Sequence, residues 1–216
     1  MLRVSKTKNF WNSFYKDGSN NKALEASSFA YFAREFIPAD SLVIDLGCGN
    51  GRDSRFLNQF NDVVGIDQSD TAIEFCKSQR LPIFETTKSL TFKVLLIEDE
   101  SICQILEAEV VKSKQKSVFV YARFFLHAIN RSQYEKFWKL AQCLNSNFSV
   151  SIGVEFRTNE DEENFKIFPD HFRRYLDPSS VVSEAELQGF KVRAIHQGYG
   201  LAKYKNEDPH IARIIF

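Results

Sequence analysis

Residues 43–51 read VIDLGCGNG, and this stretch decides the fold of the chain. An apolar strand ends in Asp45 and passes directly into three glycines at alternate positions, which let the backbone approach a ligand closely. A second apolar run, VVGI at 63–66, ends in Asp67. An acid about 20 residues after the first strand suits the two hydroxyls of a ribose. Two parallel strands that each bring an acid to one edge of a sheet, with a glycine turn between them, therefore indicate a nucleoside pocket.

Composition and charge narrow the class of protein. The 216 residues are 44% hydrophobic, which suits one packed α/β domain over 1–216 with a helical cap segment at 1–40. The net charge is zero, which argues against a nucleic-acid partner because such proteins usually carry a basic surplus. The sequence predicts no membrane span and no signal peptide, since it has no long apolar stretch and begins with a polar segment.

The four cysteines are scattered and contain no C-x-x-C pair. This pattern predicts neither a zinc site nor a disulfide framework, and it predicts no bound metal. A cytoplasmic protein with reduced thiols is therefore expected, and the sequence gives no prediction of its oligomeric state. The cysteines are Cys48, Cys76, Cys103 and Cys143.

Apolar runs alternate with helical patterns along the whole chain. This alternation predicts an α/β fold with three layers, in which helices wrap both faces of a doubly wound, mostly parallel sheet of seven strands. No helix separates the last two strands, so they are expected to pair antiparallel. The expected strands are 42–45, 63–67, 92–97, 117–122, 148–156, 190–197 and 210–216.

The glycine spacing selects among nucleoside folds. A dinucleotide fold needs G-x-G-x-x-G, but Arg52 stands where the last glycine would be. The pattern D-x-G-x-G-x-G instead resembles motif I of the class I S-adenosylmethionine-dependent methyltransferases, and the Gly-Ile-Asp ending the second strand resembles their motif II. The resemblance implies the Rossmann-like strand order 3-2-1-4-5-7-6 and S-adenosyl-L-methionine as cofactor. It places Asp45 near the methionine amine, Gly47 and Gly49 close to the ligand, and Asp67 on the ribose hydroxyls.

The third strand is expected to supply the adenine contact. In this family an acid at the end of that strand binds the adenine amino group, and Asp99 occupies the place, with Glu98 or Glu100 as substitutes if the register shifts by one. Acids at the start of a helix are also favoured by the helix dipole alone. Gln68 and Gly51 complete the predicted cofactor set.

The segment after the fourth strand is expected to lie beside the sulfonium group. It lacks the Asn-Pro-Pro-Tyr type of motif that base N-methylases of the family carry, so base methylation is disfavoured. It offers Arg123 and His127 as catalytic candidates, with His127 as general base for a hydroxyl acceptor and His171 as the second choice. The alternative is that His127 is a packed core residue.

Basic and aromatic residues gather in the loops at the same edge of the sheet. Loop 158–176 begins with acids at 159–163, which are expected to form a solvated tip, and continues with a basic, aromatic stretch. Arginine binds phosphate or carboxylate in bidentate fashion, and tyrosine adds a donor. We therefore expect a small anionic acceptor, bound by Arg157, Arg173, Arg174, Tyr199 and Tyr204.

The second half of the chain resembles a bacterial methyltransferase subgroup found with capsule and surface-polysaccharide genes. Four segments carry this resemblance: 123–129, 155–158, 171–175 and 200–209. It implies methyl transfer to an oxygen of a phosphate, sugar or phosphorylated metabolite. The alternatives are an amine or carboxylate acceptor, an inactive cofactor-binding scaffold and an RNA modifier. The aromatic segment 10–15 is either a lid over the pocket or a hydrophobic strap.

Overall fold

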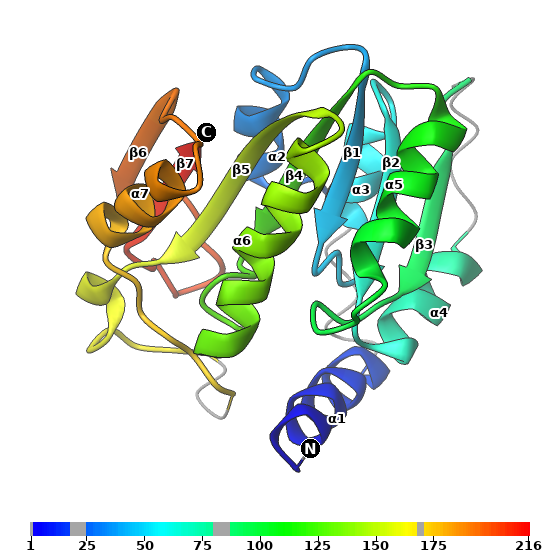
Figure 1. Cartoon of the computed structure of the whole chain (residues 1–216). Coiled ribbons are helices and arrows are strands. Elements are labelled where there is room, and N and C mark those ends of the chain that lie inside the picture. Colours follow the sequence, from blue (N-terminus) through cyan, green and yellow to red (C-terminus); the bar gives the residue numbers. More distant parts are fainter. Residues whose placement is uncertain (1, 18–24, 80–86, 168–170) are drawn as a thin grey trace.

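The computed structural model of this chain describes residues 2–17, 25–79, 87–167 and 171–216. A seven-stranded sheet forms its centre, in the order β3-β2-β1-β4-β5-β7-β6, which confirms the predicted order (Figure 1). β7 runs antiparallel to both β5 and β6, and the other pairs are parallel. The strands are β1 (Ser41–Leu46), β2 (Asp62–Asp67), β3 (Leu90–Val94), β4 (Ser117–Arg123), β5 (Ser149–Arg157), β6 (Ala194–Gly198) and β7 (Ile211–Ile215).

Helices cover both faces of the sheet because successive residues of each strand point to opposite sides and both sides are apolar. One face packs against α5 (Ile102–Ser113), α6 (Arg131–Asn145) and α7 (Pro178–Leu187). The other face packs against α2 (Ser28–Arg34), α3 (Arg52–Leu57) and α4 (Asp70–Ser78). Every residue of β1, β2 and β7 is buried, as expected for strands covered on both sides.

Three of the helices begin at polar residues that cap their first turn. Asn130 accepts a hydrogen bond from the backbone N–H of Gln133, whose side chain binds back to the backbone N–H of Asn130. Ser69 caps α4 and Asp177 caps α7 by accepting hydrogen bonds from backbone N–H groups in the first turn, without the reciprocal bond. Each cap satisfies backbone donors that would otherwise have no partner at the start of a helix, which fixes where the preceding loop ends.

A disulfide between Cys103 of α5 and Cys143 of α6 corrects the cysteine prediction. Cys48 and Cys76 are buried free thiols. The bonded pair is 40 residues apart in the sequence and meets only because α5 and α6 pack side by side, so no spacing motif announces it. The disulfide also contradicts the reduced thiols on which the cytoplasmic prediction depended.

The helix α1 (Leu2–Lys16) lies at the edge of the sheet where the parallel strands end (Figure 1). It is held against α4 by an ion pair between Lys8 and Asp70, with 2.8 Å between Nζ and Oδ2. The Ser69 hydroxyl also donates to the Asn12 side-chain oxygen at 2.6 Å. Within the described ranges, no helix combines the length and the apolar character needed to cross a membrane.

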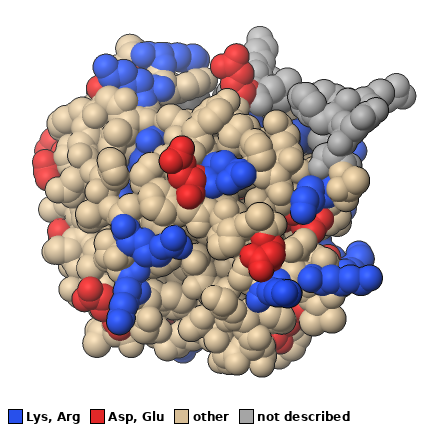
Figure 2. All heavy atoms as spheres, turned by 90° about the horizontal axis from the view of Figure 1, so that it is seen from above, with Lys and Arg blue, Asp and Glu red and all other residues tan. Residues whose placement is uncertain are grey.

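The view from above looks onto the edge of the sheet opposite to α1. Figure 2 shows Lys and Arg side chains interspersed with Asp and Glu over this face, separated by uncharged surface. Among the described residues, the face has no continuous basic surface of the kind that tracks a phosphate backbone. The mixed charge agrees with the net charge of zero.

Candidate active site

A cavity of about 980 Å³ opens at the carboxyl edge of the sheet. Its walls come from the ends of β1, β2 and β4, the loops that follow β3 and β5, and the inner face of α1. Ligands of open α/β sheets bind at this edge, where the strand order reverses between β1 and β4. The fold thus brings many of the predicted site residues, but not all of them, to the edge where a ligand is expected.

The glycine turn after β1 is folded so tightly that side chains would not fit. Gly47 and Gly49 line the cavity with φ values of 73° and 55°, in the left-handed region that favours glycine. A Cβ at Gly47 would lie 2.8 Å from the Phe125 ring, and one at Gly49 would lie 2.3 Å from the Tyr15 hydroxyl. Gly51 does not line the cavity, contrary to prediction, because it starts α3 and faces away from it. The turn is therefore a cradle for a closely packed ligand.

Asp67 stands at the end of β2 beside this cradle. Its Oδ2 accepts a hydrogen bond from the Gly49 N–H at 3.0 Å, and its Oδ1 accepts one from the Ser69 N–H at 2.8 Å. Burial raises the pKa of Asp67, while these backbone donors lower it. Gln68 follows it and also lines the cavity. A carboxylate has about four acceptor sites, so its oxygens retain capacity for the hydroxyls of a ribose.

Asp45 is buried at the end of β1 and lines the same cavity. The Ser54 hydroxyl donates to its Oδ2 at 2.5 Å. Burial, together with the nearby carboxylates of Asp53 and Asp67, raises the pKa of Asp45 to about 7, although the Ser54 hydrogen bond and the Arg123 cation lower it. A cation in the cavity would lower the pKa of Asp45 again, because it favours the charged carboxylate. Asp45 and the cradle thus fit a ligand that carries an ammonium group.

The part of the cavity wall where the sequence predicts the adenine contact differs from the first choice of residue. β3 ends at Val94, three residues earlier than expected, so the following turn places Glu98 in the cavity wall. Gln133 of α6 donates a hydrogen bond to Glu98 and lines the cavity too. Asp99 and Glu100 do not line it, and Asp99 instead accepts a hydrogen bond within the turn. The alternative acid named from the sequence is therefore the one that faces the cavity.

His127 is buried in the cavity wall with a defined hydrogen bond. Its Nδ1 accepts from the backbone N–H of Arg157 at 3.1 Å. An amide N–H can only donate, so Nδ1 is unprotonated and the neutral ring carries its proton on Nε2. Burial and then the Arg157 cation hold the pKa of His127 well below its usual range. This arrangement argues against the predicted general-base role, because His127 presents a donor rather than an acceptor at its second nitrogen.

Two guanidinium groups face the cavity near the ends of β1 and β4. Arg123 donates from Nε to Oε1 of the buried Glu155 at 2.9 Å, and Arg213 donates to the other oxygen of that carboxylate at 2.7 Å. Arg52 lines the cavity as well, and its pKa is lowered by burial and then by the Arg123 cation. In the sequence, Arg52 is informative only because it excludes a dinucleotide fold. Its place in the cavity wall is visible only in the folded structure.

Arg157 lines the cavity, but its charge is already balanced inside the protein. One Nη donates to Asp161 at 2.6 Å and the other donates to Glu207. All three side chains are buried. The sequence predicts that the acids at 159–163 form a solvated tip, and this is wrong for Asp161, which is buried in its ion pair with Arg157. Arg157 is better explained as part of the wall than as an acceptor-binding residue.

The remaining predicted acceptor residues separate into two groups. Arg173 and Tyr204 line the cavity. Arg174 does not, because its guanidinium lies 4.9 Å from the ring centre of a tyrosine of α6. Tyr199 does not either, because its ring packs edge-on against a histidine ring 4.9 Å away. The contacts that turn these two side chains away from the cavity correct their predicted role.

Aromatic side chains of α1 form one wall of the cavity. Trp11, Phe14 and Tyr15 line it, and the rings of Phe10 and Trp11 lie 5.2 and 5.3 Å from the ring of His171. Burial and neighbouring arginine cations lower the pKa of His171 to about 4, so this ring is neutral near pH 7. The N-terminal segment therefore occupies the position of a lid, one of the two alternatives left open by its sequence.

Comparisons with known proteins agree with this geometry. The family described as "Methyltransferase domain" matches residues 38–142. Protein 235L of Invertebrate iridescent virus 6, itself provisionally named a methyltransferase, is 30% identical over 207 residues, which cover 90% of this chain and 68% of the viral protein.

Solved structures show the same fold at low identity. An S-adenosylmethionine-dependent methyltransferase from Anabaena variabilis superposes with a TM-score of 0.69 and 16% identity, over 99% of this chain and 94% of the other. Magnesium protoporphyrin IX methyltransferase from Synechocystis, with bound S-adenosylmethionine, gives a TM-score of 0.52 and 14% identity over 99% and 81%. The chain belongs to the class I S-adenosylmethionine-dependent methyltransferases.

Proposed function

We propose that this methyltransferase acts on an ionised oxygen of a small anionic acceptor, a phosphate or a carboxylate. The observation that carries the proposal is the chemical state of the cavity wall. Both histidines that line it are poor proton acceptors near pH 7, whereas Arg52, Arg123 and Arg173 bring cationic groups to it. Such a wall suits an acceptor that is already deprotonated and negatively charged.

One half of the cavity would bind the cofactor and the other half would bind the acceptor. Asp45, Asp67 and Glu98 lie on the side of β1, β2 and the loop after β3, where they would hold the amine, ribose and adenine of the cofactor. Arg123 and His127 lie after β4, where they would meet the acceptor. The methyl group would therefore be transferred across the end of β4.

The residues would act mainly by positioning. S-adenosylmethionine supplies an activated methyl group, so attack by an ionised oxygen needs no proton removal. Arg123 and the Nε2–H of His127 are donors that can hold such an oxygen, and Glu155 fixes the direction of the Arg123 side chain. Holding two reactants in line is worth roughly 7–11 kcal/mol of the barrier, which accounts for useful catalysis without a general base.

The surface-polysaccharide role expected from the sequence stays a prediction. A sugar that bears a carboxylate or phosphate would satisfy both that role and the charge of the cavity. Nothing in the proposal about the ionised oxygen depends on the pathway in which the acceptor occurs.

The test is transfer of an isotopically labelled methyl group to a panel of acceptors. The panel contains carboxylated and phosphorylated sugars and metabolites, their neutral analogues, and amines. We expect label only in anionic acceptors, with the methyl on an ionised oxygen and a rate that falls in Arg123→Gln but not in the surface control Arg131→Gln. Label on an amine nitrogen or a neutral hydroxyl would overturn the proposal, and slow cofactor hydrolysis alone would favour the inactive scaffold.

A further inference from the structure

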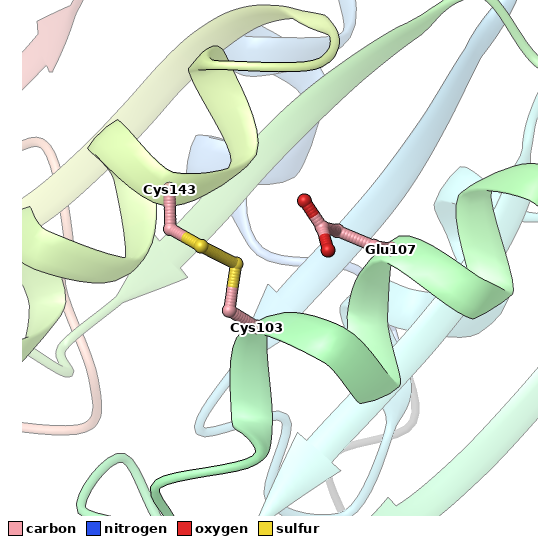
Figure 3. A group of neighbouring side chains, drawn as sticks. All are labelled: Cys103, Glu107 and Cys143. Atoms are coloured by element: carbon pink, nitrogen blue, oxygen red, sulfur yellow. A yellow bond between two sulfur atoms is a disulfide. The ribbon is translucent and has the colours of Figure 1, made fainter.

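The disulfide between α5 and α6 belongs to a cluster with metal-binding chemistry, and no residue of this cluster lines the cavity. Cys103 and Glu107 lie one turn apart on α5, and Cys143 faces them from α6. Figure 3 shows the Glu107 carboxylate beside the disulfide. The two sulfurs and a Glu107 oxygen all lie within 4.8 Å of one another. Two thiolates and a carboxylate are ligands that Zn²⁺ accepts in proteins.

We propose that the reduced form of this cluster binds Zn²⁺ through Cys103, Cys143 and Glu107, and that the disulfide form excludes the ion. The proposal concerns a site separate from the methyl-transfer site and does not depend on the acceptor. It would make the contact between α5 and α6 either a covalent bond or a metal bridge, according to the redox state of the two cysteines.

The backbone already has the spacing that such a site needs. Two thiolates at the usual Zn–S distance of about 2.3 Å, in tetrahedral geometry, place their sulfurs about 3.8 Å apart. The Cα atoms of Cys103 and Cys143 are 6.4 Å apart. Side-chain rotation can therefore separate the reduced sulfurs without moving either helix. The carboxylate of Glu107 reaches the same point from one helical turn away.

The surroundings supply the rest of a metal site. Asn147, just after α6, donates its side-chain N–H to Glu107 Oε1 at 2.7 Å, which orients the carboxylate as outer hydrogen bonds do in metal sites. Cys103 is buried among apolar residues of the core, whereas Glu107 and Cys143 are only half-buried. The half-buried side leaves room for a water molecule as the fourth ligand, completing a tetrahedral set.

A cellular dithiol can serve as the reductant of the Cys103–Cys143 disulfide. The reductant gives two electrons and two protons to the disulfide, forming two thiols and leaving as its own disulfide. Zn²⁺ binding then releases the two thiol protons. In the reverse direction, loss of the ion and transfer of two electrons to a disulfide partner restores the Cys103–Cys143 bond.

The position of the cluster connects it to the cavity wall. α5 begins just after the turn that carries Glu98, and α6 carries Gln133, which donates to Glu98. Either form of the bridge would hold α6, which carries Gln133, to the helix that follows the turn with Glu98.

The experiment uses Co²⁺ as a spectroscopic probe of the full-length protein. A trialkylphosphine reduces the disulfide, taking the oxygen of water to become the phosphine oxide, and is removed under anaerobic conditions before titration. We expect one equivalent of Co²⁺ to give a thiolate-to-cobalt charge-transfer band and the strong visible bands of tetrahedral cobalt, both abolished by Zn²⁺. Glu107→Gln should weaken binding on the order of tenfold or more. Glu109→Gln, on the same helix and paired with Lys93, is the matched control and should bind normally.

Several outcomes would overturn the proposal. These are no thiolate band in reduced protein, an equal signal in oxidised protein, or a signal that persists in the double variant Cys103→Ser/Cys143→Ser. The last result would place the ion at Cys48 and Cys76 instead. If circular dichroism shows that the double variant does not fold, the affinities of the Glu107→Gln and Glu109→Gln variants for Co²⁺ are compared instead, because both variants retain the cysteine pair. Equal affinity of these two variants would then refute the site.

Discussion

The raised pKa of Asp45 predicts how cofactor affinity depends on pH. In the folded protein without cofactor this carboxyl titrates at about 7, well above its ordinary value of 3.8. Below pH 7 it is mostly protonated, whereas the proposed contact with the cofactor ammonium group requires the carboxylate. Binding should therefore release a proton, and affinity should fall as the pH falls below 7. Above about pH 8 the affinity should be constant.

The size of the loss in cofactor affinity follows from the difference between the pH and the pKa of Asp45. At pH 5 the group is two pH units below a pKa of about 7 and about 1% ionised, so affinity should fall about 100-fold, or roughly 2.7 kcal/mol. Calorimetric titration with S-adenosylhomocysteine measures this without turnover. Repeating it at pH 6 in buffers of different ionisation enthalpy should show close to one proton released. Asp45→Asn should bind more weakly at pH 8 and lose most of the pH dependence.

The same pKa has a consequence for stability with the opposite trend. Because the folded protein holds the Asp45 proton to higher pH than the unfolded chain does, this group's contribution makes the free energy of unfolding fall as the pH rises from about 4 to 7. Saturating S-adenosylhomocysteine should remove that fall. An affinity that stays constant between pH 5 and pH 8 would refute the reasoning, because it would mean that no buried carboxyl must ionise on binding.

Other perturbations test separate parts of the structure. Asp67→Ala should weaken S-adenosylhomocysteine binding by about 3 kcal/mol in calorimetry, because it removes charged hydrogen bonds to the ribose, and unchanged affinity would contradict that role. Arg123→Gln should lower kcat/KM for an anionic acceptor roughly 10- to 100-fold with little loss of stability, since Arg213 still pairs with Glu155; an equal loss with a neutral acceptor would argue against charge recognition. Arg157→Gln should instead destabilise the fold by about 3–5 kcal/mol, because the buried carboxylates of Asp161 and Glu207 lose their partner. An unchanged melting temperature would contradict this structural role of Arg157. Reduction of the disulfide without metal should lower the free energy of unfolding by about 4 kcal/mol for a closed loop of this length, and denaturant titration with and without reductant measures it.

The sequence predicts the backbone of the cofactor side well. The glycine turn and the acids at the ends of β1 and β2 are local features, and alternation of strands and helices determines which edge they share. The strand order came from the family resemblance and is confirmed. The end of β3 is less predictable, because the turn at 95–99 is set by hydrogen bonds to Asp67 and Asp99 rather than by hydrophobic pattern.

Charges on the acceptor side are harder to interpret from sequence. Arg157 and Arg173 look alike in the chain, yet only the fold shows that Arg157 is neutralised by Asp161 and by Glu207, 50 residues away. Whether a histidine can act as a base likewise depends on its partners, as the backbone N–H at His127 shows. The sequence identifies the residue types, but their pairing decides which charges remain available to a ligand.

Contacts between residues far apart in the sequence explain why the disulfide and the position of α1 could not be predicted. The two bonded cysteines are connected by no motif, only by the packing of two helices. The aromatic segment of α1 has the same composition whether it acts as a lid or a strap, and its position becomes clear only from Asn12 and Lys8 holding it on α4.

The most direct measurement of the central claim is a crystal structure with S-adenosylhomocysteine bound. The account predicts that both ribose hydroxyls lie within about 3 Å of the Asp67 carboxylate oxygens, with the sulfur facing Arg123 and His127. A cofactor whose ribose makes no contact with Asp67, or whose sulfur faces away from the end of β4, would contradict it.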